Sequence, residues 1–304
     1  MSVDFGDEPD FSLDDTFHDD PTRALYPRQL IIYDEQSNIW SPCEEEEIIV
    51  QTDYIAVSYR QSDFPNRDKL EESIRIVCHA SGIPAYWLDY ACTGATQKEK
   101  NRDLYRIADV FRGAKKTLIM VKGDEDRPLA NGWQSWGNRI WTLPEALLSQ
   151  ELIYKVGTRF IKGITLRRVA NMAYKDRYEE MMLIEGYSGK DPLSLVERIE
   201  LLRKAIWKRS SGVDKKVSVP GTSSSGGVFT SYPGERVYAL MGFCPRRIRP
   251  NRHDSEEEAF RKLKIANGLG DHLFSWEIEA PPQITPAPEG FQSPPRLLSP
   301  HSSV

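Results

Sequence analysis

Three short apolar runs, each separated from the next by enough chain for one helix, constrain this sequence most. The runs are YIAVSY at 54–59, AYWLDY at 85–90 and KTLIMV at 116–121. Between them, residues 67–80 and 98–111 carry apolar side chains at helical spacing, which predicts an amphipathic helix in each gap. Strands that alternate with single helices form a parallel sheet with helices on both faces. The expected fold class is therefore α/β.

The alternation continues with a short helix predicted over 143–149 and a fourth strand, LIYKV, at 152–156. Upstream, QLIIY at 29–33 and EIIVQ at 47–51 are β-branched runs separated by turn-prone residues, which predicts an entry hairpin or edge strands. Beyond the fourth strand the pattern becomes helical, with an amphipathic helix predicted over 193–207. We therefore expect a flavodoxin-like parallel sheet flanked by helices, with a mostly helical C-terminal extension.

Composition divides the chain into a folded body and two tails. Residues 1–20 carry many aspartates and neither lysine nor arginine, and residues 281–304 are rich in proline and serine. Neither segment buries enough apolar surface to offset chain entropy, so both are expected to be disordered. The body comprises an α/β domain at 26–157 and a helical extension of the same domain at 158–276. Within it, the glycine- and serine-rich stretch at 210–233 predicts a flexible loop.

Charge and composition disfavour several classes of protein. The 304 residues carry a formal net charge of −5 without a dense basic stripe, which disfavours nucleic acid as a partner. The N-terminus is acidic rather than apolar, and no apolar run approaches the roughly 20 residues that span a bilayer. Four widely separated cysteines without a C-x-x-C predict reduced thiols rather than a disulfide framework or a zinc site. A cytoplasmic protein without membrane or metal is expected.

Five segments in a fixed order carry a resemblance to a known family. YIAVSY at 54–59, YWLDYAC at 86–92 and RIWTLPEALLS at 139–149 resemble the motifs Y-x-A-L-S-Y-x-W-G, W-I-D-x-x-C-I-x-Q and R-G-W-T-L-Q-E-x-L-L-S of the HET domain, the fungal heterokaryon incompatibility module. YPRQLIIYD at 26–34 and GERVYALMGF at 234–243 resemble its lead-in strand and its downstream D-x-V-Y-A-L-x-G segment. The layout is also similar to that of TIR domains, to which HET domains are thought to be distantly related.

The chain departs from the HET motifs at several positions. Arg60 and Gln61 stand where W-G usually follows the first motif, and Ala95 stands where the second motif usually has glutamine. Ile140 and Pro144 replace the glycine and glutamine of the third motif. Such departures are expected both of a divergent active member and of a member that has lost its activity.

Glu145 is the first candidate for the chemistry that the resemblance implies. In TIR-type enzymes that hydrolyse NAD, a glutamate shortly after a tryptophan sits beside the nicotinamide ribose, and Glu145 follows Trp141 by four residues. A carboxylate there stabilises the oxocarbenium character that develops at the ribose. Trp141 is a candidate to stack on a base or on the nicotinamide ring, or else packs in the core. The alternative for Glu145 is a first-turn glutamate that complements the helix dipole, with Pro144 favouring a helix start there.

Other candidates lie where the predicted strands end, at the carboxyl edge at which open parallel sheets bind ligands. Asp89 ends its strand, where it could bind a ribose hydroxyl, orient Arg139 or cap the next loop. Ser58, Tyr59 and Arg60 form the edge of the first strand, and Arg60 could hold a phosphate. Tyr59 has packing as its alternative role. These residues complete the predicted substrate-binding set.

The resemblance implies a protein of fungal nonself recognition and regulated cell death, with NAD as the substrate of a glycohydrolase and no bound cofactor. The alternative is a catalytically inert member of the family that signals by self-association or by binding a protein partner in trans. A third reading is a diverged member without a present role in cell death. The sequence lacks G-x-G-x-x-G, a Walker loop and H-E-x-x-H, so dinucleotide oxidoreductases, P-loop NTPases and zinc hydrolases have no support.

Overall fold

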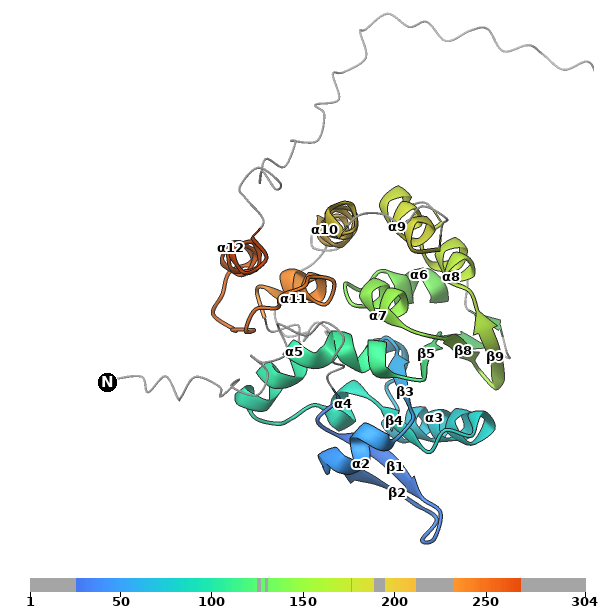
Figure 1. The fold of residues 1–304 in the computed structure, drawn as a ribbon. Helices are drawn as coiled ribbons and strands as arrows, with labels where there is room; N and C mark the ends of the chain where they lie inside the picture. Colours follow the sequence, from blue (N-terminus) through green and yellow to red (C-terminus); the bar gives the residue numbers. More distant parts are fainter. Residues whose placement is uncertain are drawn as a thin grey trace, which may run out of the picture. The chain divides into compact units, whose positions relative to one another are not determined.

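A seven-stranded mixed sheet forms the centre of the fold (Figure 1). The computed structural model describes residues 26–124, 127–128, 131–175, 177–188, 195–211 and 232–268. The strands of the sheet are β1 (Leu30–Asp34), β2 (Ile39–Cys43), β3 (Tyr54–Ser58), β4 (Ala85–Trp87), β5 (Lys116–Met120), β8 (Leu152–Val156) and β9 (Arg159–Ile164). The predicted tails at 1–20 and 281–304 and most of the predicted flexible loop, residues 212–231, lie outside the described residues.

The order of the strands along the sheet is β2-β1-β4-β3-β5-β8-β9. β3 runs parallel to β4 and β5, and β5 runs parallel to β8, which makes a parallel core of four strands. β1 is antiparallel to β2 and β4, and β9 is antiparallel to β8. The α/β class predicted from the alternation of strands and helices is confirmed, and antiparallel strands extend the parallel core at both edges.

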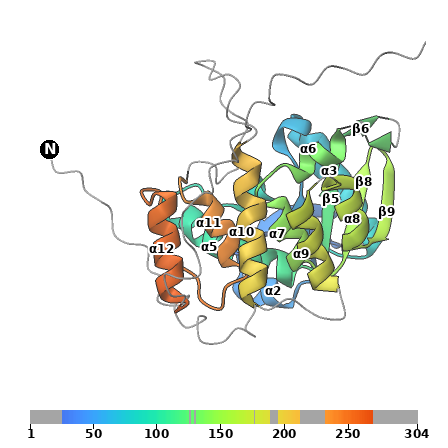
Figure 2. The same ribbon diagram turned by 90° about the horizontal axis from the view of Figure 1, so that it is seen from above.

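Helices fill the connections and form an outer layer. They are α2 (Glu46–Gln51), α3 (Arg67–Ser81), α4 (Asp89–Cys92), α5 (Gln97–Gly113), α6 (Gly132–Gly137), α7 (Thr142–Leu148), α8 (Leu166–Ala173), α9 (Tyr178–Ser188), α10 (Leu195–Ser211), α11 (Glu235–Met241) and α12 (Glu256–Ala266). A two-stranded ribbon of β6 (Gly123–Asp124) and β7 (Arg127–Pro128) precedes α6. In Figure 2, α8, α9 and α10 lie side by side, with α7 beneath them.

Side chains of β4 show which helix covers which face of the sheet. The Tyr86 hydroxyl donates to Glu71 of α3 at 2.9 Å. The next residue, Trp87, packs against Phe111 of α5 with ring centroids 5.9 Å apart. Because successive residues of a strand point to opposite faces, α3 and α5 cover opposite faces of the sheet. α7 packs beside α5 on the same face (Figure 1).

Local sequence explains where the two crossover helices begin and end. The Asn66 side chain accepts a hydrogen bond from the backbone N of Lys69 at 2.9 Å and caps α3, as the sequence predicts. α3 ends at Gly82, whose φ of 65° glycine adopts without strain. Thr96 and Glu99 form a reciprocal capping box at the start of α5.

One predicted strand is a helix. The run EIIVQ at 47–51 lies in α2, and the strand that pairs with β1 is β2. Its acidic start explains the difference, because Glu46 and Glu47 lie in the first turn, where negative charge complements the helix dipole. The predicted entry hairpin therefore exists, but its second strand comes earlier in the chain.

Two boundaries also differ from those predicted. β4 ends at Trp87, and Asp89 begins the short helix α4 instead of ending the strand. The chain does not turn helical after residue 157, because Gly157, with a φ of 53°, lies in a tight turn that leads into β9. The elements described beyond β9 are helices, so the helical extension begins about one strand later than predicted.

Candidate functional site

Ser58 and Glu145 meet at the carboxyl end of the parallel strands. Ser58 is the last residue of β3, and its face of that strand also carries Tyr54, whose hydroxyl reaches the carbonyl of Val110 in α5 at 2.7 Å. The side chain of Ser58 therefore points toward the α5 and α7 layer. Its hydroxyl donates a hydrogen bond to Oε2 of Glu145 on α7. Nε1 of Trp136 on α6 donates to Ser58 Oγ at 2.9 Å, so the hydroxyl has a partner on each side.

Both members of this pair are shielded from water. Ser58 is 1% exposed and Glu145 is 6% exposed. Burial raises the pKa of Glu145 to about 7; Asp89 adds to the rise, whereas Arg139 and the hydrogen bond from Ser58 oppose it. Near neutral pH the carboxyl is therefore present in both protonation states. A carboxyl group with this property can accept or donate a proton at physiological pH.

The helix-dipole interpretation of Glu145 accounts for part of this arrangement. Glu145 does lie in the first turn of α7, although the helix begins at Thr142 and Pro144 is its third residue rather than its first. A side chain that only complements the dipole is usually exposed to solvent. The burial of Glu145 and its bond to Ser58 are not needed for that role.

Tyr59, Asp89 and Arg139 form a second group beside the first. The Tyr59 hydroxyl donates to Oδ1 of Asp89 at 2.6 Å, and Arg139 donates to the backbone carbonyl of Tyr59. Asp89 Oδ1 also accepts a bond from the backbone N of Tyr90 at 2.7 Å, as expected of a residue that caps the following segment. Tyr59, only 2% exposed, thus connects Asp89 to Arg139.

Arg60 is the accessible cation among the predicted residues. Its side chain is 42% exposed and lies 4.0 Å from Asp63. Its guanidinium donates to Ser135 Oγ on α6 at 2.5 Å. The side chain therefore spans from the end of β3 to α6, with much of its surface open to a solute.

Trp141 lies in the interior, where the second half of the chain supplies its partner. It is 6% exposed, and its Nε1 donates to Oε1 of Glu235 on α11 at 2.7 Å. Burial raises the pKa of Glu235, while the bond from Trp141 and the charges of Arg139 and Arg236 oppose the rise. The indole is thus held in place by α11.

Two residues of this site, Trp136 and Glu235, were not predicted from the sequence. Trp136 lies in the stretch GWQSWG, which matches no motif used in the sequence analysis. Glu235 had a signal, because it is the second residue of the segment GERVYALMGF, where the HET motif that this segment resembles has its aspartate. The predicted residues Ser58, Tyr59, Asp89, Arg139 and Glu145 do come together through direct bonds and electrostatic interactions.

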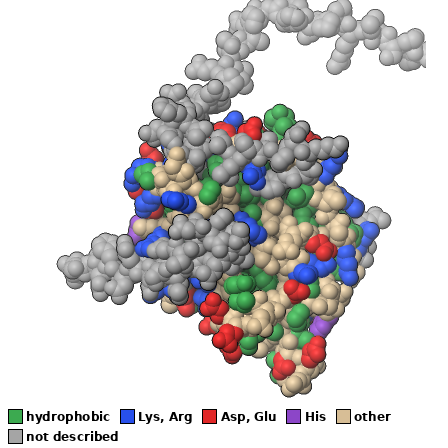
Figure 3. All heavy atoms as spheres, viewed as in Figure 1, with side chains coloured by type: hydrophobic (Ala, Val, Ile, Leu, Met, Phe, Trp, Pro, Cys, Tyr) green, Lys and Arg blue, Asp and Glu red, His purple; other side chains and the backbone are tan. Residues whose placement is uncertain are grey.

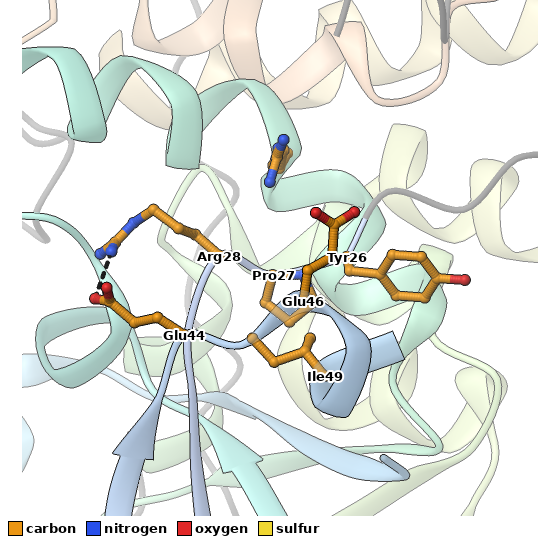
Figure 4. A pocket seen from close by; sticks show the side chains of 7 residues that line it. Tyr26, Pro27, Arg28, Glu44, Glu46 and Ile49 are labelled. Atoms are coloured by element: carbon orange, nitrogen blue, oxygen red, sulfur yellow. Dashed lines mark hydrogen bonds and ion pairs between the residues drawn. The ribbon is translucent and has the colours of Figure 1, made fainter. Parts of the chain in front are cut away.

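A separate pocket of about 120 Å³ lies between the lead-in to β1, α2 and α5 (Figure 4). It is lined by Tyr26, Pro27, Arg28, Glu44, Glu46, Ile49 and Arg106. Acidic side chains gather where α2 begins, at the lower left of the face in Figure 3. Arg28 donates to Glu44 at 2.7 Å and lies 3.4 Å from Asp103, so acidic neighbours balance its charge. None of the predicted site residues lines this pocket.

The described part of the chain gives little support for cysteine catalysis or for metal chemistry. Cys92 is buried, and burial raises its pKa to about 12, which leaves almost no thiolate at neutral pH. Among the residues described, no group of three His, Cys, Asp or Glu side chains is arranged to hold a metal ion. No helix within those residues has the length and apolar character needed to cross a membrane.

The fold and the site define an α/β protein with a buried carboxyl and hydroxyl pair at the carboxyl edge of its parallel strands. Comparison with protein-family models, with curated proteins and with solved structures found no match.

Proposed function

We propose that this chain is a HET-like protein of fungal nonself recognition and regulated cell death, and that it hydrolyses the nicotinamide N-glycosidic bond of NAD. The observation that carries the proposal is the buried carboxyl of Glu145, bonded to Ser58 at the end of β3 and with its pKa raised to about 7. NAD is proposed as the substrate because the motifs resemble those of HET and TIR domains. The proposal places the reaction in the cytoplasm.

Hydrolysis of this N-glycosidic bond needs one carboxylate beside the ribose C1′, the carbon at which the reaction occurs. The bond between the ribose C1′ and the nicotinamide nitrogen breaks, and its electron pair leaves with the neutral nicotinamide. Glu145 in its ionised form stabilises the positive charge that develops on the ribose. Water then attacks C1′, and Glu145 accepts the proton that the water releases. A pKa near 7 gives a substantial fraction of the ionised form at neutral pH.

The neighbouring residues have roles that follow from their positions. Arg139 favours the ionised form of Glu145 through its charge. Asp89 and Ser58 are the polar groups for ribose hydroxyls, and the 42% exposed Arg60 is the cation for the phosphates. Trp141 provides an indole face for the nicotinamide ring.

The strand order supports a flavodoxin-like and TIR-like assignment. Counted along the chain, the parallel strands β3, β4, β5 and β8 occupy the spatial order 2-1-3-4. This agrees with the first four strands of the flavodoxin-like order, in which ligands bind where the strand order reverses. That point lies between β3 and β5, and Ser58 is the residue at the end of β3.

One observation favours the alternative, an inert module that works by self-association or by binding a protein partner in trans. Ser58 and Glu145 are bonded to each other and are almost fully buried. A substrate reaches Glu145 only if these contacts open. An inactive descendant would keep the pair as a packing feature, and Ile140 and Pro144 at two motif positions agree with such a history.

Expression in a yeast host separates the two versions, with cellular NAD and viability measured together. The glycohydrolase version predicts that the wild-type chain depletes NAD and lowers viability, and that Glu145→Gln does neither. Glu258→Gln is the matched control, because Glu258 also lies in the first turn of a helix, α12, but on the surface. Toxicity that persists in Glu145→Gln with normal NAD supports the inert module.

A further inference from the structure

The indole N–H of Trp136 begins a buried chain of two hydrogen bonds that ends on Glu145. Trp136 lies on α6 and donates to Ser58 Oγ at 2.9 Å, and the Ser58 hydroxyl donates in turn to Oε2 of Glu145. Trp136 and Ser58 are each 1% exposed and Glu145 is 6% exposed, so little water competes for these bonds. The chain of bonds links α6, β3 and α7.

The chemistry of the indole fixes the direction of these bonds. An indole N–H can only donate, so Ser58 Oγ must accept from Trp136. The single hydrogen of the Ser58 hydroxyl then remains for Glu145. A protonated Glu145 could donate to Ser58 instead, but the serine hydrogen would then lose the acceptor that it has in this structure. The chain of donors therefore favours the ionised form of Glu145.

Close backbone packing at both ends of α6 holds Trp136 in place. A Cβ at Gly132, the first residue of α6, would lie 2.6 Å from the carbonyl oxygen of Lys122. A Cβ at Gly137, the last residue, would lie 2.9 Å from that of Ala173. The indole N–H therefore comes from a helix that is fixed at both ends.

We propose that Trp136 is a positioning residue of the candidate site, which acts through Ser58 to set the ionisation of Glu145. The inference rests on the proposed function only in taking Glu145 as the working carboxyl. A donor that binds Ser58 Oγ polarises the hydroxyl, which strengthens the bond that this hydroxyl donates to the carboxylate. Trp136 thereby helps to keep Glu145 ionised near neutral pH, which is the form that the proposed hydrolysis uses.

The charged groups that act on Glu145 come from other elements than α6. Arg139, which precedes α7, favours the ionised form of Glu145, whereas Asp89 of α4 opposes it. Within the described residues, the buried carboxylates of α5 and α9, the helices that pack against α7, are paired with arginines, as Asp103–Arg28, Asp109–Arg247 and Glu180–Arg177. A substitution at Trp136 leaves all of these groups in the protein.

Trp136→Phe removes the donor and keeps a buried ring, and Trp133→Phe is its matched control. Trp133 lies in the same helix and is 6% exposed, but its Nε1 has no hydrogen-bond partner among the residues that the structure describes. NMR titration of the 304-residue chain, labelled with ¹³C at glutamate carboxyls, measures the ionisation of Glu145, whose signal is absent in Glu145→Gln. We expect its midpoint to rise by about 0.5 pH unit or more in Trp136→Phe, a roughly threefold change in the ionisation constant. It should stay in place in Trp133→Phe.

A double-mutant cycle separates an action through Ser58 from a change in packing. Trp136→Phe is repeated in a Ser58→Ala background, where the indole has no hydroxyl to polarise. If Trp136 acts through Ser58, the added substitution leaves the Glu145 midpoint of that background unchanged. An equal shift in both backgrounds, or no shift in folded Trp136→Phe, overturns the proposal.

The wild-type protein provides a second readout that needs no variant. The indole N–H resonance of Trp136 should shift with the same midpoint as the Glu145 carboxyl, because the two hydrogen bonds share Ser58 Oγ. A Trp136 resonance that does not follow the titration of Glu145 overturns the proposal. If both titrations behave as expected but the wild type releases no nicotinamide from NAD, the proposed function fails and the role of Trp136 stands.

Discussion

The hydroxyl of Ser58 donates a hydrogen bond to the carboxyl of Glu145 and so joins two residues that are 87 positions apart in the chain. The bond connects the end of β3 to the first turn of α7. The indole N–H of Trp136 on α6 donates a second hydrogen bond to the Ser58 hydroxyl. The protonation state of one buried carboxyl is thereby coupled to the packing of α6 and α7 on the sheet. Stability and chemistry at this site should depend on the same titration.

As the pH rises, the wild-type protein should lose free energy of unfolding relative to Glu145→Gln. The folded-state pKa of Glu145, about 7, lies above its ordinary value of 4.5. The folded protein therefore holds this proton more tightly than the unfolded chain does. The resulting stabilisation is complete below about pH 4.5 and is lost as pH rises through 7, a total of about 3 kcal/mol for a difference of 2.5 in pKa.

Urea unfolding of both proteins across this pH range measures the effect. The variant should gain stability relative to the wild type as pH rises, because glutamine has no proton to lose. For Glu258→Gln, the difference in free energy of unfolding from the wild type should stay nearly constant between pH 4.5 and 7, because the hydrogen bond from Arg261 lowers the pKa of Glu258 and its carboxyl stays ionised in that window. If the free energies of unfolding of the wild type and Glu145→Gln changed with pH in parallel, the folded-state pKa of Glu145 would not be raised, and the prediction would fail.

Ser58→Ala should lower the free energy of unfolding by about 1–3 kcal/mol, because it leaves two buried groups without a partner, the Glu145 carboxyl and the Trp136 indole N–H. It should also raise the pKa of Glu145 further, since the bond from Ser58 opposes the rise. Ser81→Ala is the control, because the Ser81 hydroxyl has no hydrogen-bond partner. Ser81→Ala should change the free energy of unfolding by no more than about 0.5 kcal/mol. Equal losses in the two variants would contradict a special role for Ser58.

The elements that the sequence predicted well are those whose local signals agree with their tertiary environment. β3 is buried along its whole length and was predicted from a continuous apolar run, and α3 begins at its predicted cap, Asn66. EIIVQ at 47–51 was assigned to a strand because β-branched residues favour strands, but an acidic first turn favoured helix α2 instead. Short apolar runs do not by themselves distinguish these two outcomes.

The site shows the same contrast. Ser58, Asp89 and Glu145 were predicted because each lies beside a strand end or in a family-like motif. Trp136 and Glu235 were not, because their roles come from the packing of α6 and α11 against the sheet layer. The segment at 234–243 marked the position of Glu235, but its partner, Trp141, lies 94 positions earlier in the chain, and that segment does not reveal the contact.

Arg60→Ala should raise the KM for NAD by about tenfold or more and leave the fold intact, because a charged hydrogen bond to phosphate is worth roughly 1.5–3 kcal/mol. Arg60 is 42% exposed, so its removal opens no cavity in the core. Lys115→Ala removes another exposed cation, which lies 3.6 Å from Asp53 at the start of β3. Steady-state kinetics should show a normal KM for that control. Equal effects in both variants would point to overall charge rather than to a phosphate site.

Nicotinamide release from NAD by the purified 304-residue chain tests the central claim most directly. The assay compares the wild type, Glu145→Gln and Glu258→Gln at a protein concentration high enough to permit self-association, with folding checked by circular dichroism. The account predicts release by the wild type and by Glu258→Gln, and a loss of at least a hundredfold in Glu145→Gln, since removing a charge that stabilises the transition state costs about 3 kcal/mol. No release by any of the three folded proteins, or equal release by all three, would contradict it.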